Sequence, residues 1–520
     1  MFSKFSSRLL SLGKCSSIAL LLALASTHVA CAQDLPLQNT GLPEVPEPAS
    51  ANASAPAVSG AVRPVSVDDS PSLADGKSEN DLESLAARIV DLEAQLKESA
   101  EADKKNAEKD KADKDKAQKE KSQKDKKDSS NPLDKFKEKW NVKLGGHVQM
   151  DYVNWANASP TFTGAQDYFE FRRLRLVADG TGYGVYDFRL QMTLEPESVG
   201  ETQPLGTVAS PDVKDAYLSM NEIPGLGRFR IGNFFVPFGL EQVTNDTNNI
   251  FLERSIPTQG IFTADREVGV ALYNSTEDQY LTWTSGVFFD SISEGLKERI
   301  DDNQGYRAVG RLTWLPYYDE SSKGRYLFHT GMGVLHTEDN DRRVRFRARP
   351  QVREGQRLID SGVLNASSYT TGNLEAAWVC GRVTIQSEAF LSDVRLVTAD
   401  NQYVQGCYIH GSYFLTGENR IFDKFGQHGA QFGRNVPNKN FFVTDCYAGP
   451  GAWELKTRWS YLDLNNVGAG QYNDFTAGVN WYWSDRTRIM FDWIHPFTTN
   501  DTTFGATESD LLAMRFDFNW

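Results

Sequence analysis

The chain has 520 residues, with 55 basic and 69 acidic side chains, so its formal net charge is −14. A chain this acidic is not expected to bind nucleic acid, because the phosphate backbone is held by positive side chains. No apolar run reaches the roughly 18–20 residues that a membrane-spanning helix needs, which excludes an α-helical membrane protein.

The first 32 residues have the order of a secretory signal peptide. Positive side chains come first: Lys4, Arg8 and Lys14. An apolar stretch at 18–25 follows, and the small residues at 30–32 offer a cleavage site. A lipoprotein signal at Cys31 is the alternative, but His28 stands where such a signal has Leu or a similar residue. We therefore predict export with cleavage after residue 32.

Two segments of different composition follow the leader. Residues 33–80 are rich in Pro, Ala, Ser and Val without periodicity, which is typical of a disordered linker. Residues 81–139 begin with a short apolar seam and continue as a Lys-rich, mixed-charge spacer. The seam consists of Leu82, Leu85, Ile89, Leu92 and Leu96. It predicts a coiled coil, although one amphipathic helix packed on another element has the same spacing.

From residue 140 onwards the hydrophobic pattern has a period of two, which is typical of strands. The last strand is the clearest, because apolar residues share one face: Leu512, Met514, Phe516, Phe518 and Trp520. The opposite face carries Ala513, Arg515, Asp517 and Asn519. Similar alternation occurs at 187–194, 453–461 and 475–493, the last with a hairpin turn at Ser484 and Asp485.

The alternation fits both a soluble β-sandwich and a membrane-spanning barrel. Trp and Tyr near the strand ends favour the barrel, because aromatic girdles lie at membrane interfaces. The charged faces suit a water-filled lumen and would be costly in a sandwich core. Closure also leaves no unpaired strand edge in hydrocarbon. We predict an all-β, antiparallel transmembrane barrel over residues 140–520, with sixteen strands and about 24 residues per strand and connection.

Several short motifs follow one another along this segment. They are Phe-Arg-Arg-Leu-Arg-Leu at 171–176, Val-Lys-Asp-Ala-Tyr-Leu at 213–218, Arg-Ile-Gly-Asn-Phe at 230–234, Val-Pro-Phe-Gly-Leu-Glu at 236–241, Phe-Leu-Glu-Arg-Ser at 251–255, Arg-Glu-Val-Gly at 266–269, Arg-Phe-Arg-Ala-Arg-Pro at 345–350, Leu-Thr-Gly-Glu-Asn-Arg at 415–420 and Trp-Glu-Leu at 453–455. As an ordered set they resemble the phosphate-selective porin O/P family of bacterial outer-membrane channels, over about residues 142–520. The resemblance implies a sixteen-stranded homotrimeric barrel in the outer membrane, with the N-terminal stalk in the periplasm and a lumen lined by basic side chains that passes anions.

Basic residues on the polar strand faces are the candidates for an anion path. Four of them share one face of a predicted strand: Arg343, Arg345, Arg347 and Arg349. Side chains two apart along a strand lie about 6.6–6.8 Å apart, so this file of arginines could pass a hydrated anion from one guanidinium to the next. Arg suits the task because its planar fork binds phosphate or carboxylate and stays charged. Further candidates on other strands are Arg173, Arg175, Arg189, Arg228, Arg230, Lys456 and Arg458.

Each of these cations has an alternative, structural role, because lumen arginines often pair with wall carboxylates and make the barrel rigid. The family's phosphate selectivity also draws on a cluster of lumen lysines, which cannot be placed in this sequence. We therefore predict passive diffusion of small hydrophilic solutes, with anions such as phosphate or polyphosphate as the expected class.

Two other classes of function were weighed. An enzyme is not expected, since the sequence has neither a Gly-x-Ser-x-Gly nor a His-Glu-x-x-His motif, and no cofactor or metal is predicted. The second is a structural outer-membrane anchor, in which residues 81–139 contact the cell wall and the barrel only holds them in the lipid. The two roles are compatible with each other.

Overall fold

The computed structural model describes residues 140–520 apart from gaps at 161–164, 196–210, 290–304, 340, 356, 445–446, 500–501 and 503–504. The predicted signal peptide, linker and stalk, residues 1–139, lie outside the described residues. The described helices include α4 (Leu240–Val243) and the 3-10 helix η3 (Asn465–Val467). No helix in this part of the chain is long and apolar enough to cross a membrane.

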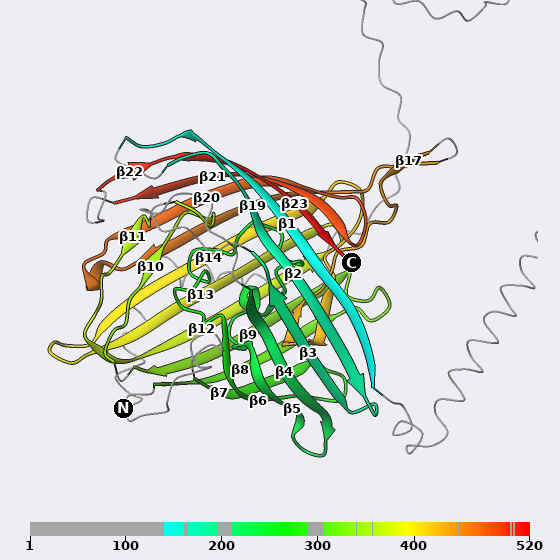
Figure 1. The fold of residues 1–520 in the computed structure, drawn as a ribbon, viewed down its shortest axis with the longest axis horizontal. Helices are drawn as coiled ribbons and strands as arrows, with labels where there is room; N and C mark the ends of the chain where they lie inside the picture. The colour runs from blue at the N-terminus through cyan, green and yellow to red at the C-terminus, as the bar shows by residue number, and fades with distance from the viewer. Residues whose placement is uncertain are drawn as a thin grey trace, which may run out of the picture. The chain divides into compact units, whose positions relative to one another are not determined.

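Long antiparallel strands form the wall of the molecule (Figure 1). Sixteen of them make the barrel: β1 (Asn141–Asn157), β2 (Tyr168–Gly182), β3 (Tyr186–Thr193), β4 (Asp212–Ile223), β5 (Gly227–Phe235), β6 (Arg266–Ser275), β7 (Leu281–Phe288), β8 (Tyr306–Tyr318), β9 (Tyr326–Glu338), β12 (Ala366–Cys380), β13 (Val383–Leu396), β14 (Gln402–Phe414), β19 (Ala452–Asp463), β20 (Gln471–Tyr482), β21 (Thr487–Thr498) and β23 (Asp510–Asn519). The small strand β22 (Thr507–Glu508) pairs with β21 just before β23 begins.

The first and last strands close the barrel. β1 pairs with β23 from His147 opposite Asn519 to Asn157 opposite Asp510, so no edge of the wall is left unpaired. Each of the other wall strands pairs with its neighbours along the chain, all antiparallel. The prediction of a closed, antiparallel, sixteen-stranded barrel is therefore confirmed.

The two ends of the barrel differ in their connections. Where β1 begins and β23 ends, most connections are short turns, such as the one after Cys380, where Gly381 adopts φ 58°. We call this the short-turn end. The longer loops leave the opposite end, which is the usual arrangement in outer-membrane barrels. One connection breaks the pattern, since residues 415–451 between β14 and β19 form a long segment at the short-turn end.

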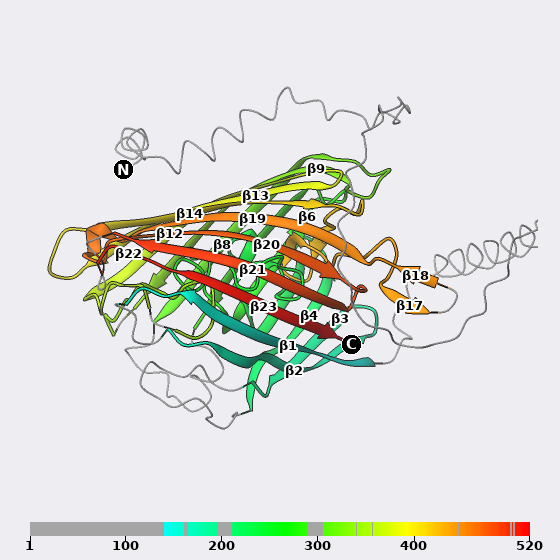
Figure 2. The same cartoon turned by 90° about the horizontal axis from the view of Figure 1, so that it is seen from above.

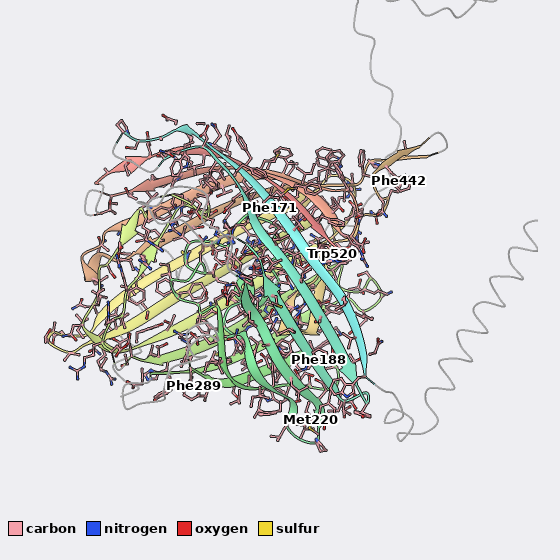
Figure 3. All side chains as sticks on the ribbon, viewed as in Figure 1. Phe171, Phe188, Met220, Phe289, Phe442 and Trp520 are labelled. Carbon is pink, nitrogen blue, oxygen red and sulfur yellow. The ribbon has the colours of Figure 1, made fainter. Side chains whose placement is uncertain are left out.

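The two faces of the wall have opposite chemistry. On β23, the Leu512 and Met514 side chains are 50% and 40% exposed, whereas the Arg515 and Asp517 side chains are each only 1% exposed. Apolar side chains therefore point outwards, where lipid solvates them, and polar side chains point into the lumen. Figure 3 labels several of the exposed apolar residues around the molecule, among them Phe171. The predicted alternation is present with the predicted assignment of faces.

Aromatic rings gather on the wall near the short-turn end. The Trp453 and Trp481 rings stack with centroids 4.9 Å apart, and the Phe441 ring meets Trp481 edge-on at 4.6 Å. Both indole N–H groups donate to the carbonyl oxygen of Pro450. Such rings, apolar with a polar handle, suit the level of the lipid headgroups.

Three connections carry structure of their own. The β5–β6 loop (residues 236–265) contains α4. The β9–β12 loop (residues 339–365) contains the two-residue strands β10 (Arg347–Ala348) and β11 (Ile359–Asp360). The β14–β19 segment (residues 415–451) contains two hairpins, formed by β15 (Phe422–Gly426) with β16 (Gly429–Phe432) and by β17 (Phe442–Thr444) with β18 (Tyr447–Gly449). Figure 2 shows the second hairpin projecting at the end where the C terminus lies.

The apolar core lies inside the barrel, where these connections pack on the wall. Phe262 of the β5–β6 loop stacks on Phe390 of β13 at 5.6 Å and contacts Phe346 of the β9–β12 loop at 6.4 Å. All three side chains are at most 3% exposed. The lumen is therefore narrowed by loops that are fixed to its wall.

Candidate functional site: the charged lumen

The β5–β6 loop is attached to the far wall of the barrel by a buried carboxylate. Glu388 on β13 accepts hydrogen bonds from the backbone N–H groups of Leu240 and Glu241, at 2.9 and 2.7 Å. Gly239 precedes them with φ 81°, and a Cβ there would lie 2.8 Å from a Glu388 carboxylate oxygen. The backbone conformation and the close approach both require glycine at this position.

Asp246 of the same loop forms ion pairs with three arginines. Its carboxylate lies 3.1 Å from the guanidinium groups of Arg173 and Arg175 on β2, and 2.8 Å from that of Arg254. Burial alone would raise the pKa of the Asp246 carboxyl, but Arg173, Arg254 and Arg175 outweigh it and hold the pKa well below its usual value. Asp246 therefore stays ionised and ties the loop to β2.

Glu253 makes a second link of the same kind. Its carboxylate lies 2.7 Å from Arg172 and 2.9 Å from Arg515. Burial opposes ionisation here as well, but Arg172, Arg173 and Arg515 lower the pKa of Glu253 below the normal range. Arg515 also binds Asp151 on β1 at 2.6 Å. The loop is thus joined to both strands at the seam where the barrel closes.

Lys456 and Arg458, two predicted path residues on β19, also hold the β5–β6 loop. The Lys456 ammonium lies 2.5 Å from Asp492 and donates to the Ile250 carbonyl oxygen at 2.6 Å. The Arg458 guanidinium lies 3.1 Å from Glu241. Both side chains are at most 4% exposed, so loop atoms surround them.

Arg189, Arg228 and Arg230 meet the hairpin of β15 and β16. Arg189 donates to the Gln427 side-chain oxygen at 2.7 Å, and Arg228 donates to the Gly426 carbonyl oxygen at 3.0 Å. An Arg230 nitrogen lies 3.3 Å from Nδ1 of the next hairpin residue, His428. These three arginines therefore bind the turn of the β15–β16 hairpin, which enters the lumen from the short-turn end.

The file at 343–349 differs from the sequence-based expectation in its location. It lies in the β9–β12 loop, and only Arg347 and Ala348 pair as a strand, with β11. The alternation itself is present, because Val344, Phe346 and Ala348 are buried in the core while Arg343, Arg345 and Arg347 are exposed. Burial of the apolar face in the core therefore turns the arginine face towards solvent.

The four arginines of the file are not equally neutralised. Arg345 forms a two-pronged pair with Asp360, one arm at 2.8 Å, and Arg349 donates to the Gly355 carbonyl oxygen at 3.0 Å. Within the described residues, the side chains of Arg343 and Arg347 have no hydrogen-bond or ion-pair partner. The file therefore contains two guanidinium groups that form no direct ion pair, although Asp360 lies opposite Arg347 in the β10–β11 pair.

Arg357, which the sequence reasoning missed, belongs to the same cluster. Burial and the guanidinium groups of Arg349 and Arg347 lower its pKa to about 10. Arg357 therefore adds a further positive charge to the β9–β12 loop. No alternation pointed to Arg357, because it lies after the file on the way to β11.

The structure thus separates the predicted path residues into distinct groups. Arg343, Arg345, Arg347 and Arg349 lie together in the β9–β12 loop. The pairs on β2 and β19 bind the β5–β6 loop, and the arginines of β3 and β5 bind the lumen hairpin. The acidic loop residues Glu241, Asp246 and Glu253 were missed, although two of them lie in motifs that carried the family resemblance. Across the described ranges, no group of three or more His, Cys, Asp or Glu side chains could hold a metal ion.

A closed sixteen-stranded wall with a charged, loop-narrowed lumen defines a porin-type transmembrane barrel. The sequence model of the family described as phosphate-selective porin O and P matches residues 142–520, so the chain belongs to this family. An uncharacterised protein of Caulobacter vibrioides is 29% identical over 339 residues, which cover 62% of this chain and 62% of that protein. Porin O of Pseudomonas aeruginosa is 23% identical over 420 residues, which cover 73% of this chain and 89% of Porin O.

Two solved outer-membrane proteins are similar to the chain at low sequence identity. The anion-selective porin from Comamonas acidovorans is 12% identical, with a TM-score of 0.44 over 74% of this chain and 100% of that chain. A loop-deletion mutant of OmpT, an outer membrane protein of Vibrio cholerae, is 10% identical, with a TM-score of 0.46 over 74% of this chain and 100% of that chain.

Proposed function

We propose that the barrel is an outer-membrane channel for passive diffusion of small hydrophilic anions, with phosphate and polyphosphate in the permitted class. The observation that carries this proposal is the arginine file of the β9–β12 loop, which presents Arg343 and Arg347 to solvent without partners in the described part of the chain. A guanidinium that is not held in a direct ion pair attracts anions and repels cations in a narrow lumen. Family membership supports a channel, and we infer no catalytic role.

The predicted path residues take different parts in this mechanism. The anion is bound in turn by the four arginines of the file, Arg343, Arg345, Arg347 and Arg349. Arg173, Arg175, Lys456 and Arg458 hold the β5–β6 loop in place and so set the width of the lumen. Arg189 and Arg230, with Arg228, hold the lumen hairpin. Their partners support this division. The cations of β2 and β19 form ion pairs with loop carboxylates, and the arginines of β3 and β5 donate hydrogen bonds to amide and carbonyl oxygens of the hairpin.

We further propose that the short-turn end faces the periplasm and that the stalk at 81–139 leaves there. This proposal is supported by β1, which begins at that end with Asn141. Outer-membrane barrels place their short turns in the periplasm and their long loops outside. A homotrimer, assisted by the apolar seam of the stalk, and contact of the stalk with the cell wall complete the proposal.

Single-channel recording in planar bilayers tests the channel proposal, with ion selectivity taken from the reversal potential across a KCl gradient. We expect stepwise, anion-selective conductance. Arg347→Gln should lower the anion-to-cation permeability ratio more than Arg345→Gln, because Asp360 already offsets the charge of Arg345. Arg486→Gln is the matched control, since this arginine lies in an exposed turn between β20 and β21. Cation-selective conductance, or equal effects of all three variants, would contradict the proposal.

A further inference from the structure

A cavity of about 350 Å³ lies between the β5–β6 loop, the β9–β12 loop and the barrel wall. This volume is at the lower end of the roughly 300–1,000 Å³ of small-molecule sites, so it can hold a solute larger than inorganic phosphate. Its charged lining residues are Asp265, Glu267, Arg307, Asp339, Arg343 and Arg345. The lining thus has as many carboxylates as guanidinium groups.

Most of these charges are already offset. Arg307 and Glu267 pair with each other, and Arg345 pairs with Asp360. Asp265 lies 3.2 Å from Arg266, which is itself paired with Asp215. Among the described residues, Arg343 and Asp339 have no side-chain partner. Arg343 and Asp339 are therefore the charged lining groups that are free to bind a solute, while Asp265 shares its arginine with Asp215.

We propose that this cavity is a binding station for zwitterionic solutes, namely free α-amino acids, whose carboxylate binds Arg343 and whose ammonium group binds Asp339. The inference rests on the proposed channel function, because the cavity belongs to the same lumen. A carboxylate fits the guanidinium fork of Arg343, and the ammonium group removes the repulsion that Asp339 exerts on a simple anion. Ile261, Val344 and Phe346 also line the cavity, so its inner wall has apolar atoms that the amino-acid side chain can contact.

The test measures how far leucine and two close analogues reduce the KCl current of the whole chain in planar bilayers. N-acetylleucine keeps the carboxylate and loses the ammonium group, and leucinamide does the reverse. We expect leucine to bind best. Asp339→Asn should weaken leucine binding by about tenfold or more, the usual effect of losing a charge-assisted hydrogen bond, but should not weaken N-acetylleucine binding, because it also removes a repulsion. Arg343→Gln should weaken the binding of leucine and N-acetylleucine and should not weaken the binding of leucinamide.

Asp341→Asn and Arg342→Gln are the matched controls, since neither residue lines the cavity. If Asp339→Asn leaves leucine binding unchanged, or leucine binds no better than N-acetylleucine, the zwitterion site is overturned. Anion-selective conductance that leucine does not affect would overturn this inference and leave the proposed channel intact. If the folded protein conducts nothing, the channel proposal fails, and calorimetric titration of the protein in detergent with the same three compounds still decides whether the site exists.

Discussion

At the scale of single residues, charge in the lumen is organised by which partner each group meets. Arg173 and Arg347 are both arginines of alternating segments, yet the first is 5% exposed and bound to Asp246, whereas the second is exposed. A buried guanidinium that pairs with a loop carboxylate gives little field to a passing ion. Residue type and face are therefore insufficient to assign a cation to the ion path.

Asp246→Asn should destabilise the protein by about 3 kcal/mol, the lower end of the range for breaking a buried ion pair. The lower end applies because Glu253 still lies 3.9 Å from Arg173, and Glu195 lies 3.3 Å from Arg175. Urea unfolding in lipid vesicles measures the change. Asp341→Asn, an exposed acid of the β9–β12 loop, is the control and should change the free energy of unfolding by less than about 0.5 kcal/mol. Equal effects of the two variants would show that the three arginines do not depend on Asp246.

At the scale of elements, the β5–β6 loop should detach from the wall in acid. The folded-state pKa values of Asp246 and Glu253 are lowered, so the folded loop binds fewer protons than the free loop. Their stabilising contribution is present above the free carboxyl values of about 4 and is lost as pH falls through the lowered folded-state values. Single-channel conductance should therefore be steady from pH 7 to 5, and it should become larger and noisier only as pH falls well below about 4. A conductance that already rises between pH 7 and 5 would contradict this account of the anchor.

The hairpin of β15 and β16 should narrow the channel. It lies in the lumen, where Arg311 donates to the Ala430 carbonyl oxygen at 3.0 Å and the Phe432 amide donates to Thr244 at 3.3 Å. Replacing residues 422–432 by a short Gly-Ser linker should raise single-channel conductance. The same replacement of residues 442–449 is the matched control, because the hairpin of β17 and β18 projects away from the barrel at the short-turn end (Figure 2). An equal change in both variants would rule out a specific role for the lumen hairpin.

The strands of the barrel wall could be predicted from the sequence, but the positions of the loops inside the lumen could not. Alternation on β23 is a local signal, since each outward residue meets lipid and each inward residue meets polar atoms, whatever lies beyond them. The position of the arginine file depends on Phe346 packing against Phe262, which is distant in sequence. The hydrogen bond from Arg189 to Gln427 joins residues that are 238 positions apart in the sequence. Such contacts follow from how the loops fold back into the lumen, which period-two patterns do not encode.

At the scale of the whole molecule, the net charge of −14 opposes the selectivity proposed for the lumen. Which of the two controls ion selectivity, the total charge of the chain or the lumen arginines, depends on the distance over which each acts in salt solution. The screening length is about 10 Å at 0.1 M salt and about 3 Å at 1 M, so an ion among the arginines responds mainly to groups that it nearly touches. We expect the anion-to-cation permeability ratio to exceed one at both salt concentrations.

The ratio should also fall as KCl rises from 0.1 to 1 M, because salt weakens the pull of Arg343 and Arg347 on ions that do not touch them. Reversal potentials at a constant tenfold gradient measure this dependence, and Arg347→Gln should flatten it. If the total charge of the chain set the selectivity instead, the channel would prefer cations at 0.1 M and lose that preference with added salt. The sign of the reversal potential at low salt therefore distinguishes control by a few uncompensated arginines from control by the whole acidic molecule.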